Sequence, residues 1–115
     1  MTMDGKIGEV SRNEERARGA GHDPVILAGK VKVDQGTLPV GLILSRDEND
    51  ELVSYVEADG VAGVLDEAVD TTRSGSALYV AHGSVKLDVL KANVAGDAPD
   101  AALLARVQAA GIYPG

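Results

Sequence analysis

The sequence predicts a mainly β protein: a small β-barrel or β-sandwich-like domain with one C-terminal helix and an extended N-terminal arm. Two observations lead to this prediction. Short apolar runs rich in Val, Leu and Ile recur between residues 25 and 90, and turns rich in Asp, Gly, Ser or Thr separate them, which is typical of short strands. After residue 97 the apolar spacing changes to that of an amphipathic helix.

Residues 1–22 differ from the rest of the chain and are predicted to form a flexible arm. They contain charged residues of both signs, four glycines and few large apolar side chains. Such a segment buries too little apolar surface to offset the entropy lost when its backbone becomes ordered. The predicted domain boundary therefore lies between the arm at 1–22 and a β-rich domain at 23–115.

The apolar runs of this domain predict seven short extended segments. They are expected at Val25–Ala28, Val31–Val33, Leu42–Leu44, Leu52–Val56, Val61–Leu65, Leu78–His82 and Val85–Leu90, where the second is either a continuation of the first strand or its partner. The third and fourth should form a hairpin around the charged loop 46–51. In the last strand, the strict alternation of 84–89 places Val85, Leu87 and Val89 on one face, which predicts one buried and one wet side. A bend or bulge is expected at His82–Gly83.

The helix is predicted at residues 99–110. Asp97 is the expected N-cap, Pro99 lies in the first turn, and Asp100 favours the positive end of the helix dipole. Gly111 is expected to end the helix in the left-handed conformation. The apolar stripe consists of Leu103, Leu104 and Val107.

Composition excludes several classes of function. The net charge is −7, from 18 acidic and 11 basic residues, which argues against a nucleic-acid surface or an anionic membrane. The chain has no Cys, so it has no disulfide, thiolate metal site or Cys nucleophile. No apolar run reaches the ~18 residues of a membrane span, and no signal region is visible. With no Phe, no Trp and three Tyr, the core is thin, and assembly with other subunits would stabilise it.

The polar residues do not form a recognisable reactive motif. The two histidines, His22 and His82, lie far apart in sequence, and the Ser74–Ser76 turn lacks the glycine pattern of a nucleophile elbow. No catalytic, cofactor-binding or metal site is therefore predicted. A small hydrolase using Asp66, Asp70 and His82 is a further hypothesis, and it requires these side chains to meet.

The middle of the chain carries a characteristic order of segments. They are Val40–Leu44, Leu52–Tyr55, Gly60–Leu65, Ala68–Thr72, Leu78–Val85 and Asp88–Leu90, followed by a helix that ends in Ala109–Ile112. Over residues 37–113 this order resembles the head decoration (capsid cement) proteins of tailed bacteriophages, of the lambda type. The A-G-V-L block at 62–65, the acidic-Thr turn after it and the G-x-x-x-x-D-V-L run at 83–90 are its most specific parts.

The resemblance implies a non-enzymatic protein that binds the major capsid protein. It implies a homotrimer at three-fold positions of the outer head surface, which stabilises the head against internal DNA pressure. The arm would become ordered on the capsid, and the protein would be made in the host cytoplasm and reside on the virion. No cofactor, nucleic acid, membrane or small-molecule substrate is expected.

Within the arm, our own interpretation assigns the capsid contacts to five residues. They are Val10, Arg12, Arg16, Arg18 and His22. An extended arm of this kind can add a strand to the edge of a partner sheet. The alternative function is a stand-alone β-barrel module that binds a small ligand or a bacterial protein.

Overall fold

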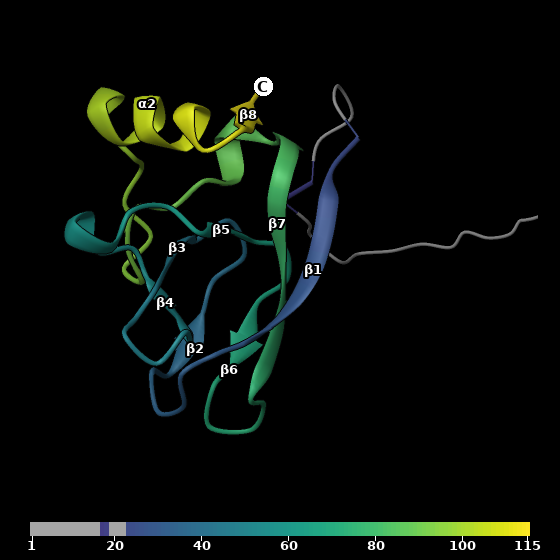
Figure 1. The fold of residues 1–115 in the computed structure, drawn as a ribbon, viewed down its shortest axis with the longest axis vertical. Helices are drawn as coiled ribbons and strands as arrows, with labels where there is room; N and C mark the ends of the chain where they lie inside the picture. The colour runs from purple at the N-terminus through teal and green to yellow at the C-terminus, as the bar shows by residue number, and fades with distance from the viewer. Residues whose placement is uncertain (1–16, 19–22) are drawn as a thin grey trace, which may run out of the picture.

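A computed structural model of the chain describes residues 17–18 and 23–115 and shows the mainly β fold that the sequence predicts (Figure 1). The strands are β1 (Val25–Lys30), β2 (Thr37–Leu38), β3 (Ile43–Arg46), β4 (Leu52–Ser54), β5 (Gly63–Leu65), β6 (Val69–Asp70), β7 (Ser76–Val85) and β8 (Ile112–Pro114). The described part also contains the α-helix α2 (Ala101–Ala109) and two 3₁₀ turns, η1 (Glu57–Asp59) and η2 (Leu87–Val89). None of its helices is long and apolar enough to cross a membrane.

The main sheet is built around β7. Its strands follow the order β1-β7-β5-β3-β4, each antiparallel to the next, and β8 lies parallel to the far end of β7. The short strands β2 and β6 form a separate antiparallel pair, at the opposite end of the molecule from α2 and β8 (Figure 1).

The sheet closes on itself where the chain that follows β1 meets β4, the strand at the other edge. Directly after β1, Val31 forms a parallel bridge with Leu52 of β4. The backbone N–H of Lys32 also donates to the carbonyl of Leu52, with an N···O distance of 3.1 Å. The chain that leaves β1 therefore pairs with β4, which makes the sheet a small barrel and covers part of its open edge.

Both faces of the central strands are buried. Adjacent residues point to opposite sides, so that Ile43 of β3 and Val64 of β5 join one apolar cluster while Leu44 and Leu65 join another. The first cluster lies under α2 and contains Ala17, Val40, Ile43, Val64, Val80, Val85, Val89, Leu90, Leu103, Val107 and Ile112. The second contains Val31, Leu38, Leu42, Leu44, Leu52, Leu65, Ala77 and Tyr79. This arrangement explains why the hairpin sequence is apolar on both faces.

The predicted hairpin is confirmed as β3–β4, with Ser45 opposite Val53. Its loop is held by Asp47, whose Oδ1 accepts hydrogen bonds from the backbone N–H groups of Asn49 at 2.9 Å and Glu51 at 3.0 Å. A carboxylate that binds the backbone of its own turn in this way makes the turn a locally encoded feature.

The strand predicted at Val85–Leu90 is wrong. Val85 ends β7, residues 87–89 form η2, and Leu87 is 47% exposed whereas Val85 and Val89 are buried. The backbone N–H of Lys86 donates to Ala17 and that of Leu87 donates to Gly115. Beyond them the N–H groups of Val89 and Leu90 donate three residues back in a 3₁₀ turn, and the chain leaves the direction of β7 to pair at Lys91 with the segment before β3. At the expected bend, β7 continues without interruption, and its register against β1 shifts there, since Val25 pairs with His82 and Ile26 with Val80.

The predicted helix is confirmed as Ala101–Ala109, but its N-cap is Asp100 and not Asp97. The Asp100 carboxylate accepts a hydrogen bond from the N–H of Leu103 at 2.9 Å, as an N-cap does. Asp97 instead accepts from the side-chain amide of Asn93. Gly111 ends the helix with a φ of 88°, the left-handed conformation that its position predicts.

Candidate functional site

Only part of the predicted arm is described by the structure. Of the five residues assigned to capsid contact, Val10, Arg12, Arg16 and His22 lie outside the described residues. Arg18 is described, together with Ala17 before it. These two residues are in contact with the barrel, at the buried carboxylate of Asp66.

Ala17 and Arg18 add a short extended piece to the end of β7. Arg18 forms an antiparallel bridge with Val85, and the N–H of Lys86 donates to the carbonyl of Ala17 at 2.8 Å. Ala17 is fully buried in the apolar cluster under α2. The folded domain therefore includes two residues that the sequence placed in the arm.

The side chain of Arg18 is bound to Asp66, which follows directly after β5. The Arg18 Nη2 lies 2.5 Å from Oδ2 of Asp66, and Nε lies 3.2 Å from Oδ2 and 3.3 Å from Oδ1. The backbone N–H of Arg18 also donates to Oδ1 at 3.3 Å. One arginine thus supplies both oxygens of the carboxylate with donors.

Asp66 is fully buried, whereas the Arg18 side chain remains 39% exposed. The hydrogen bonds that Arg18 donates to Asp66 raise the pKa of its guanidinium, partial burial opposes this shift, and the negative charge of Asp66 adds to it. Arg18 therefore stays protonated, and the pair is a salt bridge. A buried carboxylate without such a partner would be strongly destabilising, so Asp66 needs a cation at this position.

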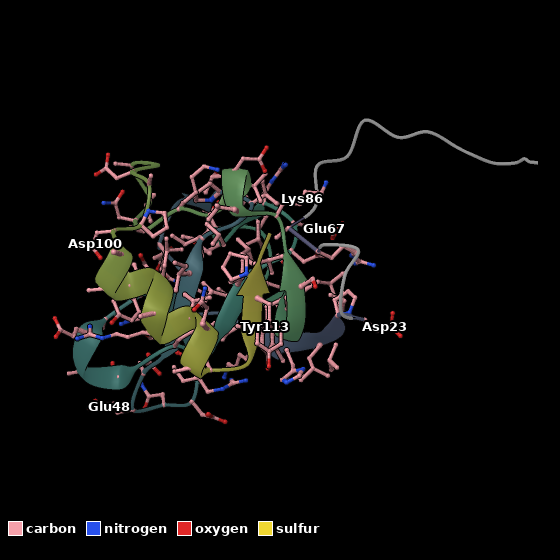
Figure 2. All side chains as sticks on the ribbon, turned by 90° about the horizontal axis from the view of Figure 1, so that it is seen from above. Asp23, Glu48, Glu67, Lys86, Asp100 and Tyr113 are labelled. Atoms are coloured by element: carbon pink, nitrogen blue, oxygen red, sulfur yellow. The ribbon has the colours of Figure 1, made fainter. Side chains whose placement is uncertain are left out.

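Further charged groups surround the entry of this segment. Glu67 acts on the Arg18 charge, and the backbone of Lys86 binds Ala17. Glu67 and Lys86 lie on one side of the molecule, beside the described piece of the N-terminal segment (Figure 2). The site therefore holds a short extended piece of the chain itself, through its backbone and through one arginine side chain.

The residues of the hydrolase hypothesis have three different sets of partners. Asp66 binds Arg18, Asp70 accepts hydrogen bonds from Thr72, and the ring of His82 packs edge-on against Tyr113 with centroids 5.9 Å apart. Within the described ranges, no group of three or more His, Cys, Asp or Glu side chains is placed to hold a metal ion.

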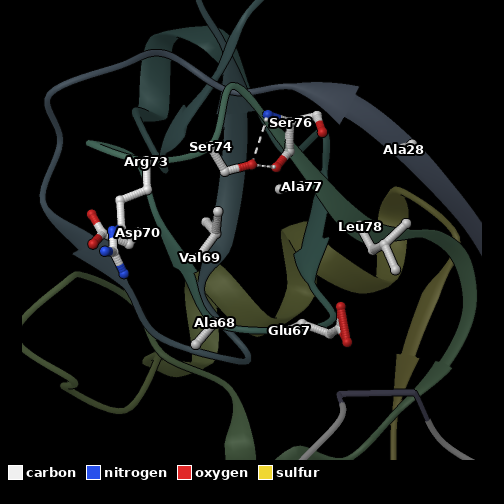
Figure 3. Close-up of a pocket in the computed structure, with 10 residues that line it drawn as sticks. All are labelled: Ala28, Glu67, Ala68, Val69, Asp70, Arg73, Ser74, Ser76, Ala77 and Leu78. Carbon is white, nitrogen blue, oxygen red and sulfur yellow. Dashed lines mark hydrogen bonds between the residues drawn. The ribbon is translucent and has the colours of Figure 1, made fainter.

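Two of the hollows on the surface are lined by described residues. One, of about 350 Å³, lies between β1 and the loop that joins β6 to β7 (Figure 3). Its Ser74 hydroxyl donates to the carbonyl of Ser76 at 2.8 Å and accepts from the N–H of Ser76. The other, of about 480 Å³, lies beside α2, where Arg106 binds the Tyr55 hydroxyl at 2.8 Å and the Glu57 carboxylate at 3.0 Å. In both, these polar groups already bind neighbouring parts of the protein.

No family model matches the chain, and no curated protein matches it. The fold and the site together define a small closed β-barrel with a helical cap, to which the base of an N-terminal segment is bound.

The sequence placed Asp66 only in the hydrolase hypothesis and did not predict its ion pair with Arg18. One signal was present. Asp66 follows an apolar run and, with a strand period of two, lies on the same face as Val64. A carboxylate that continues a buried face requires a cationic partner, although the sequence does not say which of the 11 basic residues provides it.

Proposed function

We propose that this protein is a capsid decoration protein of a tailed bacteriophage. In this proposal it binds the major capsid protein on the outer surface of the head, as a homotrimer at three-fold positions, and stabilises the head against internal DNA pressure. It is made in the host cytoplasm and resides on the virion.

The observation that supports this proposal most is the packing around Gly41. A Cβ atom at this residue would lie 1.8 Å from the carbonyl oxygen of Val89. The N–H of Gly41 donates to Leu65, and its carbonyl accepts from Lys91. Three of the segments that carry the family resemblance, Val40–Leu44, Gly60–Leu65 and Asp88–Leu90, therefore meet at one backbone contact. This part of the resemblance follows the internal frame of the fold.

The architecture also suits the mechanical role. A decoration protein stabilises a shell by binding neighbouring subunits in their assembled arrangement and not when they are apart. Trivalent binding increases the effect without requiring strong single contacts. A closed barrel supplies a rigid body for this purpose, and the bound base at Ala17–Arg18 connects the N-terminal segment to it.

Electron microscopy of the full chain mixed with empty, expanded heads of its own phage tests the proposal. Density is expected on the three-fold positions, and heads that stay bare at saturating protein would refute the decoration role. Light scattering tests the trimer separately, with the mass measured free and on addition of heads. A protein that is monomeric in both conditions would refute the trimer.

The contribution of the arm is tested by removing residues 1–16. This variant keeps Ala17 and Arg18, which occupy buried and ion-paired positions, whereas removal of 1–21 would leave the Asp66 carboxylate without Arg18. Circular dichroism should show an unchanged fold, and head binding should be lost. Full-strength binding by this variant would refute the arm hypothesis while leaving the decoration role intact.

The hollow between β1 and the β6–β7 loop favours the alternative, a barrel module that binds a small ligand. Its volume of about 350 Å³ falls in the range of small-molecule sites. A thermal-shift screen of small polar metabolites tests it. Ala68 is exposed and lines the hollow, so Ala68→Leu should fill it without changing the core. A ligand that stabilises the wild type but not Ala68→Leu would support this alternative.

A further inference from the structure

We propose that Asp66 anchors the N-terminal segment to the barrel by holding Arg18, and thereby fixes the place and direction in which residues 1–16 leave the domain. Asp66 is in this view a positioning residue. The anchor itself is independent of the proposed function, and only its effect on head binding rests on that function.

The backbone of the anchor extends an existing row of strand pairs. Residues 76–82 of β7 pair with β1, and Arg18 pairs with Val85 further along β7. The hydrogen bond from Lys86 to Ala17 fixes this register, and the buried Ala17 methyl group prevents a slip by one residue, which would turn Arg18 into the apolar cluster.

The side chain fixes the orientation as well as the position. The guanidinium and the backbone N–H of the same residue both bind Asp66, so the carboxylate holds Arg18 from two directions. Arginine suits this task because its planar group offers donors in a fixed arrangement, whereas lysine offers a single point charge on a flexible stem. A lysine at position 18 would keep the charge but lose the orientation.

Fixing the base of a binding segment improves binding by the whole protein. A segment that leaves the domain in one direction loses less conformational freedom when it reaches its partner. It also has a higher effective concentration near that partner when the domain is already bound. Loss of the anchor should therefore weaken head binding although the sequence of residues 1–16 is unchanged.

Limited digestion of the full chain with trypsin tests the anchor directly. Trypsin must take the arginine side chain into its own pocket, so Arg18 should resist cleavage for as long as Asp66 holds it. In Asp66→Asn we expect cleavage after Arg18 to be faster by about ten-fold or more, since proteolysis follows the population of the open form. Mass spectrometry identifies the product by its new N-terminus at Gly19, and cleavage after Arg12 serves as an internal reference.

Asp70→Asn is the matched control, because it removes the same charge from a nearby carboxylate that binds Thr72 and not Arg18. It should leave the cleavage rate after Arg18 unchanged. If Asp66→Asn does not fold, Arg18→Lys replaces it, since trypsin also cleaves after lysine and the charge is kept. Equal cleavage rates at position 18 in the wild type and in a folded variant would overturn the anchor.

Head binding by the same variants tests the consequence. Asp66→Asn or Arg18→Lys should raise the dissociation constant for expanded heads by about ten-fold, through a loss of preorganisation. Unchanged binding together with faster cleavage at position 18 would overturn the positioning role. If the wild type fails to bind heads, the proposed function is refuted, while the digestion experiment still decides whether the anchor exists.

Discussion

The guanidinium of Arg18 and the buried carboxylate of Asp66 join residues that are 48 positions apart in the sequence, with a shortest N···O distance of 2.5 Å. This contact connects the N-terminal segment to the turn after β5. Among the described ion pairs it is the one with a fully buried carboxylate, and it lies at the base of that segment.

Arg18→Ala should lower the stability of the domain. The substitution leaves the Asp66 carboxylate buried without its cation, which costs about 2 kcal/mol once the partial exposure of Arg18 is taken into account. Urea denaturation, with the midpoint and slope measured together, gives this value. Arg73→Ala removes an equal charge from an exposed loop and should change stability by less than about 0.5 kcal/mol. Similar losses in the two variants would contradict the role of Asp66.

Gly63→Ala should destabilise the barrel by about 2 kcal/mol through overpacking. A Cβ atom at this residue would lie 2.5 Å from Cδ2 of Tyr79 and 2.7 Å from the carbonyl oxygen of Val80. Tyr79 is itself buried, and a Cβ atom at Gly29 of β1 would lie only 2.8 Å from its Cε1. The ring is therefore close to the backbone on both neighbouring strands and has little room to move. Thermal unfolding measures the effect.

Gly75→Ala is the control for this prediction, because nothing lies within 4 Å of its Cβ position and its φ is not positive. It should be neutral or slightly stabilising, since alanine reduces the freedom of the unfolded chain. A Gly63→Ala variant as stable as Gly75→Ala would show that the strands separate easily at Tyr79.

Asp100→Ala should lower stability by about 1 kcal/mol because it removes the N-cap of α2. Asp97→Ala should have a smaller effect, since this carboxylate makes only an exposed hydrogen bond to Asn93. Guanidinium denaturation of both variants, followed by circular dichroism, compares them. A larger loss in Asp97→Ala would mean that the helix begins where the sequence first suggested.

Thr72→Val should raise the pKa of Asp70. The Thr72 hydroxyl and then its backbone N–H donate to Oδ1 of Asp70 at 2.6 and 3.0 Å, and these bonds hold its pKa below the ordinary value of 3.8. A carboxyl whose pKa is lower in the folded state stabilises the protein above its unfolded pKa. That contribution to stability is lost as the pH falls through the folded pKa. In Thr72→Val the pKa shift is smaller, so the stability should fall less over the same pH range.

NMR titration of the Asp70 carboxyl carbon gives its pKa directly. Ser74→Ala is the control, because this hydroxyl lies in the same loop but binds only Ser76. An unchanged Asp70 titration in Thr72→Val would contradict the assigned hydrogen bonds.

Local patterns determined the parts of this fold that depend on neighbouring residues. The hairpin loop is held by Asp47 within its own five residues, and the helix follows from the spacing of its apolar side chains and from Gly111. Such features rest on hydrogen bonds and contacts between residues close in sequence, so the printed sequence contains all the partners. The choice of Asp97 as N-cap failed because Asp100, three residues further on, is an aspartate as well, and only the backbone geometry distinguishes the two.

The sequence by itself determined that this protein is mainly β with a C-terminal helix, because side-chain periodicity reports secondary structure directly. Tertiary structure alone decided where strands stop, how the sheet closes and which cation Asp66 receives. The pairing of Lys91 with Gly41 and Ile43 turns the chain away from the strand predicted after Val85, and Val31 closes the barrel at Leu52. These pairings join residues far apart in the chain, and their free energy depends on which segments can reach one another at the same time, which no local pattern records.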